Sequence, residues 1–292
     1  MKTLNELSDL VRLNEPLALH TWLKVGGPAQ MFAEPHSMEE LEHLVKLAHQ
    51  QGVPVRMLGS GSNLLIRDEG VSGLIIKLTG EAFQAIDVEG PIIRAGGAAL
   101  LSNVISQSVS AGLAGLESLV GIPGTIGGAV KGNSGGRHGE IGDFVRSIEV
   151  LTSQGEHFSR SGDELSFEYR FSGISELVIL SVELELKPGD IDVITRRMRQ
   201  LWITKKASQP FSFQSAGCIF KNPRGLSAGA LIEQSGLKGT RVGGAEVSDR
   251  HANFIVTHSG ATSTDVLNLI DLIRSRVREK QSIDLETEIN IW

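Results

Sequence analysis

The sequence has little cysteine and no long hydrophobic run, and each shortage excludes a class of protein. Cys218 is the only cysteine among 292 residues, so no intramolecular disulfide can form and the chain suits a reducing compartment. No apolar stretch approaches the roughly 18 residues of a transmembrane helix, and residues 1–12 lack the basic and apolar regions of a signal peptide. We therefore expect a cytoplasmic protein that does not associate with membranes.

Aromatic residues and positive charge are also scarce. Aromatics make up 5% of the chain, and the net charge is -6 at pH 7. A nucleic-acid-binding protein needs a basic surface and often stacking aromatics, so we expect no nucleic-acid partner. The eight histidines show no metal-ligand spacing, and we expect no metal site. A small anionic ligand remains possible, because local backbone N–H groups and a few cationic side chains can outweigh the global charge.

Glycine, by contrast, is abundant, with 34 residues that gather in clusters. The first cluster follows a predicted strand and consists of Gly59, Ser60, Gly61, Ser62 and Asn63. Successive backbone N–H groups in such a turn can bind an anion. The same composition is also typical of a simple hairpin turn, which needs no ligand.

The second cluster gives a stronger prediction of phosphate binding. Residues 121–129 contain four glycines, and Ile122, Pro123 and Ile126 lie among them. A flexible linker would be polar, whereas a rigid loop without side chains lets the backbone approach a pyrophosphate. The cluster matches neither the Rossmann nor the Walker pattern.

The hydrophobic spacing predicts a mixed α+β protein. Ser37 is expected to cap the first helix, with Glu40 completing a capping box. We predict helices over residues 37–51, 100–111, 190–206, 227–235 and 262–280. The last of these helices has its apolar residues on one stripe: Val266, Leu269, Ile270, Ile273 and Val277. We predict strands over residues 53–58, 64–66, 74–78, 83–88, 92–95, 145–151, 157–160, 177–186, 218–221, 254–257 and 286–291. The strands over residues 83–88 and 92–95 are expected to form a hairpin, and those over residues 145–151 and 157–160 are expected to pair. Pro188-Gly189 and residues 68–72 are the expected domain boundaries.

Motifs distributed along nearly the whole chain resemble the UDP-N-acetylenolpyruvoylglucosamine reductase family. Their order and spacing make the resemblance specific. They are Thr21–Ala29, Leu58–Leu65, Gly121–Ala129, Tyr169–Ser172, Ala216–Pro223, Gly236–Gly239, Gly243–Ala245, Val247–Ser248, His251–Phe254 and Leu285–Glu288. The short connection from Phe171 to Leu180 resembles the form of the family without a substrate-covering insertion.

The resemblance implies a fold and a reaction. It implies a two-lobed FAD-binding region of the vanillyl-alcohol-oxidase/PCMH type over residues 1–70 and 71–189, and a substrate-binding α+β domain over residues 190–292. NADPH would reduce the FAD, which would then reduce UDP-N-acetylglucosamine enolpyruvate to UDP-N-acetylmuramate for peptidoglycan synthesis. We expect a monomer. The implied FAD contacts are Gly59, Ser60, Gly61, Ser62, Asn63, Gly121, Pro123, Gly124, Thr125, Gly127 and Gly128.

Three catalytic residues follow from the resemblance. Arg170 would hold the substrate carboxylate, which a guanidinium can bind bidentately, and Glu288 would hydrogen-bond the developing enolate or a bridging water. Cys218 stands where the family usually has a serine that gives a proton to the substrate carbon, and a thiol with a reference pKa of about 8.5 gives up its proton more readily than an alcohol. Each also has an ordinary structural interpretation: a surface ion pair, an outward-facing strand residue and a buried cysteine.

The remaining expectations concern the substrate and the departures from the family pattern. Substrate contacts are expected from Tyr169, Lys221, Asn222, Lys238 and Arg241. Residues 131–136 read Lys-Gly-Asn-Ser-Gly-Gly where the family has a sequence closer to Met-Asn-Ala-Gly-Ala, which could alter FAD affinity.

Two alternative functions stay open at this level. One is another FAD oxidoreductase of the same fold, in which His20 or His138 could tether the flavin. The other is a flavin-free ligand-binding protein, for which the replacement of serine by Cys218 is the one indication.

Overall fold

The computed structural model describes Leu4 and residues 9–292, which form two compact units. The first unit contains Met31–Gly59 and Ser72–Thr204, together with Leu4 and residues 9–13. The second contains Asn14–Gln30, Ser60–Val71 and Lys205–Trp292. Each unit therefore combines segments that are distant in sequence. The predicted division into residues 1–70, 71–189 and 190–292 stays a prediction.

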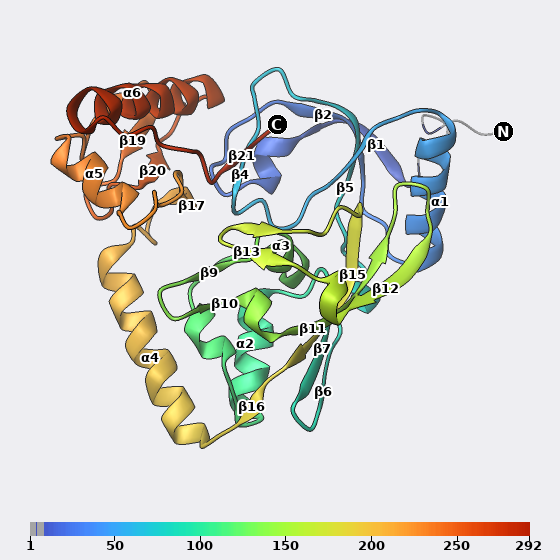
Figure 1. Cartoon of the computed structure of the whole chain (residues 1–292). Coiled ribbons are helices and arrows are strands. Elements are labelled where there is room, and N and C mark those ends of the chain that lie inside the picture. The colour runs from blue at the N-terminus through green and yellow to red at the C-terminus, as the bar shows by residue number, and fades with distance from the viewer. Residues whose placement is uncertain (1–3, 5–8) are drawn as a thin grey trace. The chain divides into compact units, whose positions relative to one another are not determined.

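A five-stranded antiparallel sheet is the main element of the first unit (Figure 1). Its order is β12-β11-β15-β7-β6. The strands are β12 (His157–Ser161), β11 (Val145–Leu151), β15 (Val178–Glu185), β7 (Ile92–Gly96) and β6 (Ile86–Glu89). Helices α2 (Leu101–Ser110) and α3 (Ile126–Lys131) share one buried apolar cluster with these strands. The predicted hairpin of β6 with β7 and the pairing of β11 with β12 are confirmed.

A second sheet has the order β1-β2-β5-β3. Its strands are β1 (Val11–Pro16), β2 (Pro28–Ala33), β5 (Val71–Ile76) and β3 (Val55–Met57). Helix α1 (Met38–Gln50) shares a core with residues of these strands, burying Leu41, Leu44, Val45, Leu47 and Ala48. Ser37 caps α1 by accepting the N–H of Glu40. The capping box is wrong, because the Glu40 carboxylate accepts the N–H of His36 instead, at 2.8 Å.

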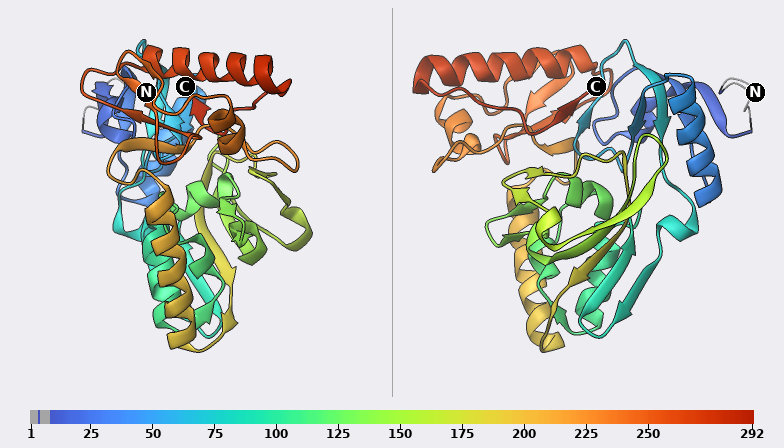
Figure 2. Two further views of the ribbon diagram at one scale, coloured as in Figure 1. Left: turned by 90° about the vertical axis from the view of Figure 1, so that its left-hand side faces the viewer. Right: turned by 45° about the vertical axis from the view of Figure 1, so that its right-hand side comes forward.

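The second unit is built around a four-stranded antiparallel sheet of order β17-β20-β19-β18. The strands are β17 (Gln214–Cys218), β20 (Phe254–Thr257), β19 (Ala245–Val247) and β18 (Arg241–Val242). Helices α5 (Ala228–Gln234) and α6 (Ser263–Gln281) share its buried cluster, and the two views in Figure 2 show α6 lying along this part of the chain. The predicted amphipathic stripe of α6 is buried as expected: Val266, Leu269, Ile270, Ile273 and Val277.

Several predicted elements differ from the structure, and three of the differences concern the predicted site. The strand expected over residues 218–221 lies earlier, as β17, because Gln214 and Ser215 pair with β20 before a bulge that precedes Cys218. The strand expected over residues 286–291 is confined to β21 (Asn290–Ile291), which pairs in parallel with β4 (Leu64–Leu65). The glycine-rich residues expected as loop include α3, because Thr125 caps a short helix.

Helix α4 (Ile191–Ser208) follows the short pair of β16 (Lys187–Pro188) with β8 (Leu113–Ala114). It is highly exposed, and Ile194 is its one fully buried residue. Within the described part of the chain, no helix has the length and apolar character needed to span a membrane.

Candidate active site

Arg170 occupies a tight turn in the first unit. Strands β13 (Phe167–Glu168) and β14 (Phe171–Ser172) pair so that Tyr169 and Arg170 form a two-residue turn. Arg170 has φ of 58°, a left-handed conformation that is uncommon and strained outside glycine. Such a conformation persists only where the surrounding structure enforces it.

Two acceptors on a neighbouring hairpin face the guanidinium. Strands β9 (Gly135–Gly136) and β10 (Gly139–Glu140) place Gly135 opposite Glu140. The Nη2 of Arg170 donates to the Gly135 carbonyl at 2.9 Å, and its Nη1 lies 3.8 Å from Glu140 Oε1. The guanidinium carbon lies 5.0 Å from the centroid of the Tyr169 ring, within cation–π range. These contacts fix the Arg170 guanidinium, whose side chain is only 17% exposed, so it differs from a mobile surface charge.

The second glycine cluster lies beside strand β7 and α2. Thr125 caps α3 by accepting the N–H of Gly128 at 3.3 Å. Gly127 donates its N–H to the Gly97 carbonyl, and a Cβ at Gly127 would lie 2.8 Å from that oxygen. Gly124 has φ of 132°, which a residue with a side chain rarely adopts. Close packing therefore accounts for Gly127, while the assignments of all the cluster's residues to the cofactor stay predictions.

The loop from Gly59 to Asn63 does not join two paired strands. Strand β3 before it pairs with β5, and β4 after it pairs with β21, so the hairpin interpretation is wrong. Gly61 has φ of 67°, and a Cβ there would collide with the His20 carbonyl. A Cβ at Gly59 would lie 3.0 Å from Thr125 Oγ1. Two glycine-rich segments far apart in sequence thus adjoin at Gly59, as the cofactor prediction requires.

In the second unit, main-chain hydrogen bonds place Glu288 next to the residue that follows Cys218. The N–H of Glu288 donates to the Ile219 carbonyl at 2.7 Å. Asn63 Nδ2 donates to the Glu288 carbonyl at 3.2 Å, and the Asn63 carbonyl accepts the N–H of Asn290. Two predicted catalytic residues and the end of the Gly59–Asn63 loop therefore meet in one place.

The segment after Cys218 is fixed by a buried amide. Asn253 is 3% exposed, its Oδ1 accepts the N–H of Phe220 at 3.0 Å, and its Nδ2 donates to the Phe220 carbonyl at 2.8 Å. Phe220 also forms a bridge with Thr287. Gly217 precedes Cys218 with φ of 74°, and nothing lies within 4 Å of a Cβ placed there. Half-buried Cys218 therefore lies at the end of a strand. Hydrogen bonds fix the backbone that follows it, and the space beside Gly217 is open.

The predicted substrate residues are distributed over both units and have protein partners. Lys221 pairs with Glu286 at 2.6 Å, Lys238 with Glu233 at 2.8 Å and Arg241 with Glu246 at 2.5 Å. Asn222 accepts the N–H of Ala228 at 2.9 Å and so supports the start of α5. Tyr169, at the Arg170 turn, is 44% exposed.

Glu246 and His251, near the predicted substrate residues in sequence, have shifted pKa values. Burial alone raises the pKa of Glu246, but hydrogen bonds from His258, at 2.7 Å, and from Arg241 outweigh it, so the pKa lies below its ordinary value. Burial lowers the pKa of His251, whose Nδ1 accepts the N–H of Asn253 at 3.2 Å. The His251 ring is therefore a neutral structural acceptor at neutral pH.

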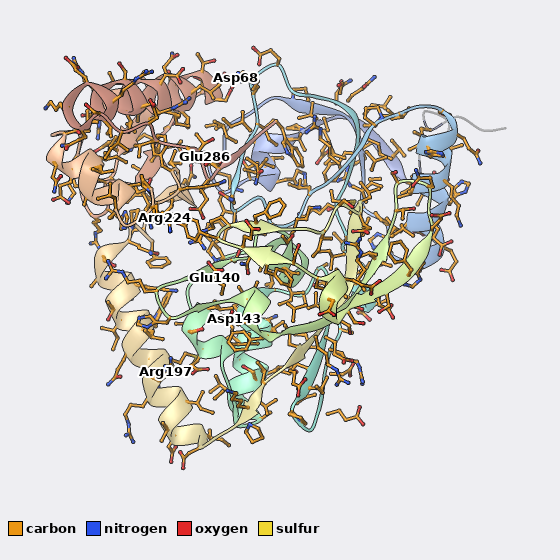
Figure 3. All side chains as sticks on the ribbon, in the orientation of Figure 1. Asp68, Glu140, Asp143, Arg197, Arg224 and Glu286 are labelled. Carbon is orange, nitrogen blue, oxygen red and sulfur yellow. The ribbon has the colours of Figure 1, made fainter. Side chains whose placement is uncertain are left out.

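Sequence reasoning missed the residues that support the predicted catalytic groups. Glu140 and Asn133 lie around Arg170, and Asn253 lies under Cys218. Figure 3 labels Glu140 beside Asp143, whose carboxylate accepts the Glu140 N–H at 3.0 Å. The only available signal was a polar residue at each of these positions within otherwise glycine-rich or apolar motifs.

Comparison with known proteins identifies the family of the chain. Residues 209–292 match the model for "UDP-N-acetylenolpyruvoylglucosamine reductase, C-terminal domain", and residues 29–160 match an FAD binding domain. The UDP-N-acetylenolpyruvoylglucosamine reductase of Moorella thermoacetica is 43% identical over 97% of this chain and 93% of its own length. The chain belongs to the UDP-N-acetylenolpyruvoylglucosamine reductase family. This confirms the resemblance inferred from the motifs.

Solved structures give the same result for the fold of this reductase family member. The crystal structure of UDP-N-acetylenolpyruvylglucosamine reductase (MurB) from Thermus caldophilus is 42% identical, with a TM-score of 0.83 over 97% of this chain and 98% of that one. Cholesterol oxidase from Brevibacterium sterolicum shares only the fold, at 15% identity and a TM-score of 0.50 over 64% of this chain and 40% of that one. The predicted fold class, an FAD-binding region plus a C-terminal reductase domain, is confirmed.

Proposed function

We propose that this protein reduces UDP-N-acetylglucosamine enolpyruvate to UDP-N-acetylmuramate, with FAD as cofactor and NADPH as hydride donor, in peptidoglycan precursor synthesis. Family membership supports the substrate class, because the chain aligns with nearly the whole length of relatives that are named as this reductase. The observation that carries the chemistry is the main-chain bond that sets Glu288 beside the Cys218 segment. Membership in this family favours the reductase over the oxidase and the flavin-free alternatives.

The residues present fit an FAD. The oxygen of Ser60 is shielded from solvent and has no hydrogen-bond partner among the residues that the structure describes. A buried hydroxyl of this kind is costly unless a ligand satisfies it. Gly59 and Gly61 leave the surrounding backbone bare, and Thr125 adjoins Gly59. These residues would hold the cofactor, which when bound transfers a hydride from NADPH to the substrate.

The protein's own residues would complete the reaction. The Arg170 guanidinium would bind the substrate carboxylate and stabilise negative charge as it builds there. The Cys218 thiol would protonate the carbon next to that carboxylate, and the resulting thiolate would regain a proton from solvent. Glu288 would hydrogen-bond the developing enolate directly or through water. Tyr169, Lys221, Asn222, Lys238 and Arg241 would contact the rest of the UDP-sugar.

The direct test is a turnover assay of the purified protein with FAD and NADPH. NADPH oxidation should require UDP-N-acetylglucosamine enolpyruvate, and mass spectrometry should identify UDP-N-acetylmuramate as the product. UDP-N-acetylglucosamine, which lacks the enolpyruvyl group, is the matched control and should give no reaction. NADPH oxidation without that product, by a folded and FAD-loaded protein, would contradict the proposal.

We also propose that the protein acts as a cytoplasmic monomer without nucleic-acid or membrane partners. The net charge of -6 and the single cysteine support this. Light scattering after size-exclusion chromatography should give the 31.4 kDa mass of one chain, and a mass twice as large would contradict the monomer.

A further inference from the structure

Asn133 connects the two hairpins that surround Arg170. Its side chain is almost wholly buried, at 1% exposure, and its backbone has φ of 41°. One amide nitrogen, Nδ2, donates to Glu140 Oε2 at 2.7 Å and to the Glu168 carbonyl at 2.8 Å. Glu168 is the last residue before the turn that carries Arg170, and Glu140 faces the guanidinium.

The other side of the same amide fixes the segment that follows Glu140. Asn133 Oδ1 accepts the N–H of Gly142 at 3.0 Å. A Cβ at Gly142 would lie 2.8 Å from that oxygen, so glycine is needed for this contact. The donor and acceptor capacity of the Asn133 amide is therefore committed to positions that set the Arg170 environment.

The two oxygens of the Glu140 carboxylate contact different groups. One oxygen accepts from Asn133, and the other lies 3.8 Å from Arg170 Nη1. Glu140 also forms a reciprocal capping box with Asp143. A carboxylate fixed by these bonds orients the guanidinium, while the 3.8 Å separation is longer than a close charge-assisted hydrogen bond. Glu140 therefore orients the guanidinium through charge rather than through a close hydrogen bond.

We infer that Asn133 is a positioning residue for the reduction of the enolpyruvyl substrate, acting through Glu140 and the Glu168 carbonyl to hold Arg170 in its strained turn. This rests on the proposed function, in which Arg170 binds the substrate carboxylate. Asn133 itself touches none of the reacting atoms. Replacing Asn133 should impair only the step in which Arg170 binds the substrate carboxylate. Reduction of the FAD by NADPH does not involve that carboxylate and should be unaffected.

The experiment compares Asn133→Asp with Asn103→Asp, an exposed control on α2, each as the FAD-loaded enzyme. The Asn133 variant replaces a donor with a carboxylate facing Glu140 Oε2 and the Glu168 carbonyl, which repel it. Reoxidation of the reduced enzyme by the enolpyruvyl substrate should slow about tenfold or more, since small misplacements of a catalytic group have effects of this size. Reduction by NADPH and the FAD content should stay within about twofold. The Asn103 variant should match the unmodified protein.

A double-mutant cycle separates positioning from general damage. In an Arg170→Lys background, Asn133→Asp should slow reoxidation by less than about threefold, because the group it positions is already replaced. A full additional loss there would overturn the positioning role while leaving the proposed function intact. If Arg170→Lys alone leaves reoxidation unchanged, both the role of Asn133 and the carboxylate assignment of the proposed function fail.

A second variant keeps the test decisive if Asn133→Asp does not fold. Glu140→Gln preserves an acceptor for Asn133 but removes the charge facing Arg170. The KM for the enolpyruvyl substrate should rise about tenfold, with reduction by NADPH unchanged. Glu89→Gln, which weakens an exposed pair with Arg94, is the matched control. An unchanged KM in the Glu140 variant would overturn the inference.

Discussion

The surroundings of Arg170 and of Cys218 are organised in different ways. Arg170 lies in a strained two-residue turn, and side chains surround it: the Asn133 amide and the Glu140 carboxylate. Cys218 lies at the end of a strand, and the backbone that follows it is fixed by main-chain bonds of Ile219 with Asn253 and Glu288 and by the buried Asn253 amide. The predicted carboxylate-binding residue therefore depends on a network of side chains, while the predicted proton donor depends mainly on main-chain hydrogen bonds, supported by one buried amide.

This contrast predicts how each region responds to substitution. A site fixed by main-chain bonds keeps its geometry when one of its side chains is replaced, so activity can fall without loss of fold. A site held by a side-chain network loses geometry when a supporting residue changes.

Replacing Cys218 with alanine should have the largest effect on turnover. Loss of a proton donor lowers the rate by about 100- to 10,000-fold, whereas reduction of the FAD by NADPH should be unaffected. Rapid-mixing absorbance measurements of the two half-reactions check this. Thermal unfolding should be nearly unchanged, because the main chain fixes the segment.

Cys218→Ser is the matched control for the thiol. A hydroxyl can also donate a proton, so this variant should retain far more turnover than Cys218→Ala. Equal losses in the two variants would show that Cys218 packs rather than reacts.

Replacing Arg170 with alanine should be almost as damaging. Removal of one preorganised electrostatic group costs about 100- to 1,000-fold in rate, and the loss should appear in the substrate half-reaction. Arg146→Ala, which removes an exposed side chain 3.4 Å from Glu183, should leave both half-reactions unchanged. A normal substrate half-reaction in the Arg170 variant would remove the guanidinium from the mechanism.

A smaller effect, on stability alone, is expected from Asp68→Asn. The Asp68 carboxylate accepts the N–H groups of Ser263 and Thr264 at 2.9 and 3.1 Å, beside one end of α6 (Figure 3). Partial burial raises its pKa, but these hydrogen bonds outweigh burial and hold the pKa below its ordinary value. Because Asp68 is exposed, solvent screening keeps the loss near that of an ordinary helix cap, about 1 kcal/mol of unfolding free energy at pH 7.

The pH dependence of this effect has a definite sign. The stabilisation by the carboxylate is complete above its unfolded-state pKa of about 4 and is lost as the pH falls through the lower folded-state pKa. Urea unfolding of the two proteins should therefore converge at acidic pH. Asp271→Asn, at an exposed position on α6, should show no difference at any pH.

The smallest effects are expected from Lys238→Ala and Arg241→Ala. Each side chain already has an acidic partner, Glu233 or Glu246, so its attraction for the substrate diphosphate is partly offset. The KM for the UDP-sugar should rise only a few-fold, about the contribution of one screened surface charge. Steady-state kinetics at low and high salt check this, since a diphosphate contact should weaken as salt increases.

The sequence predicted the elements with clear periodicity. The α6 stripe, the β6–β7 hairpin and β20 agree with hydrophobic spacing and turn residues. Spacing failed at β17, because Ser-Ala-Gly resembles a loop although Gln214 and Ser215 pair with β20. It also failed at α3, since a helix that contains two glycines depends on tertiary packing for its stability.

The candidate site was predictable only in part. Motif resemblance gave Arg170, Cys218 and Glu288, but no local pattern indicates that Asn133 reaches Glu140 and Glu168. That contact depends on two hairpins folding next to one another, which hydrophobic spacing does not report. The same limit applies to Asn253, whose partner Phe220 lies 33 residues away in the chain.

The most direct test of the central claim is an anaerobic spectral titration of the FAD-loaded protein. NADPH should bleach the flavin absorption, and UDP-N-acetylglucosamine enolpyruvate, added next, should restore it in the unmodified protein but only very slowly in the Cys218→Ala and Arg170→Ala variants. Restoration at an unchanged rate in both variants would contradict the assigned roles, and a bleached spectrum that the substrate does not restore in the unmodified protein would contradict the proposed reaction.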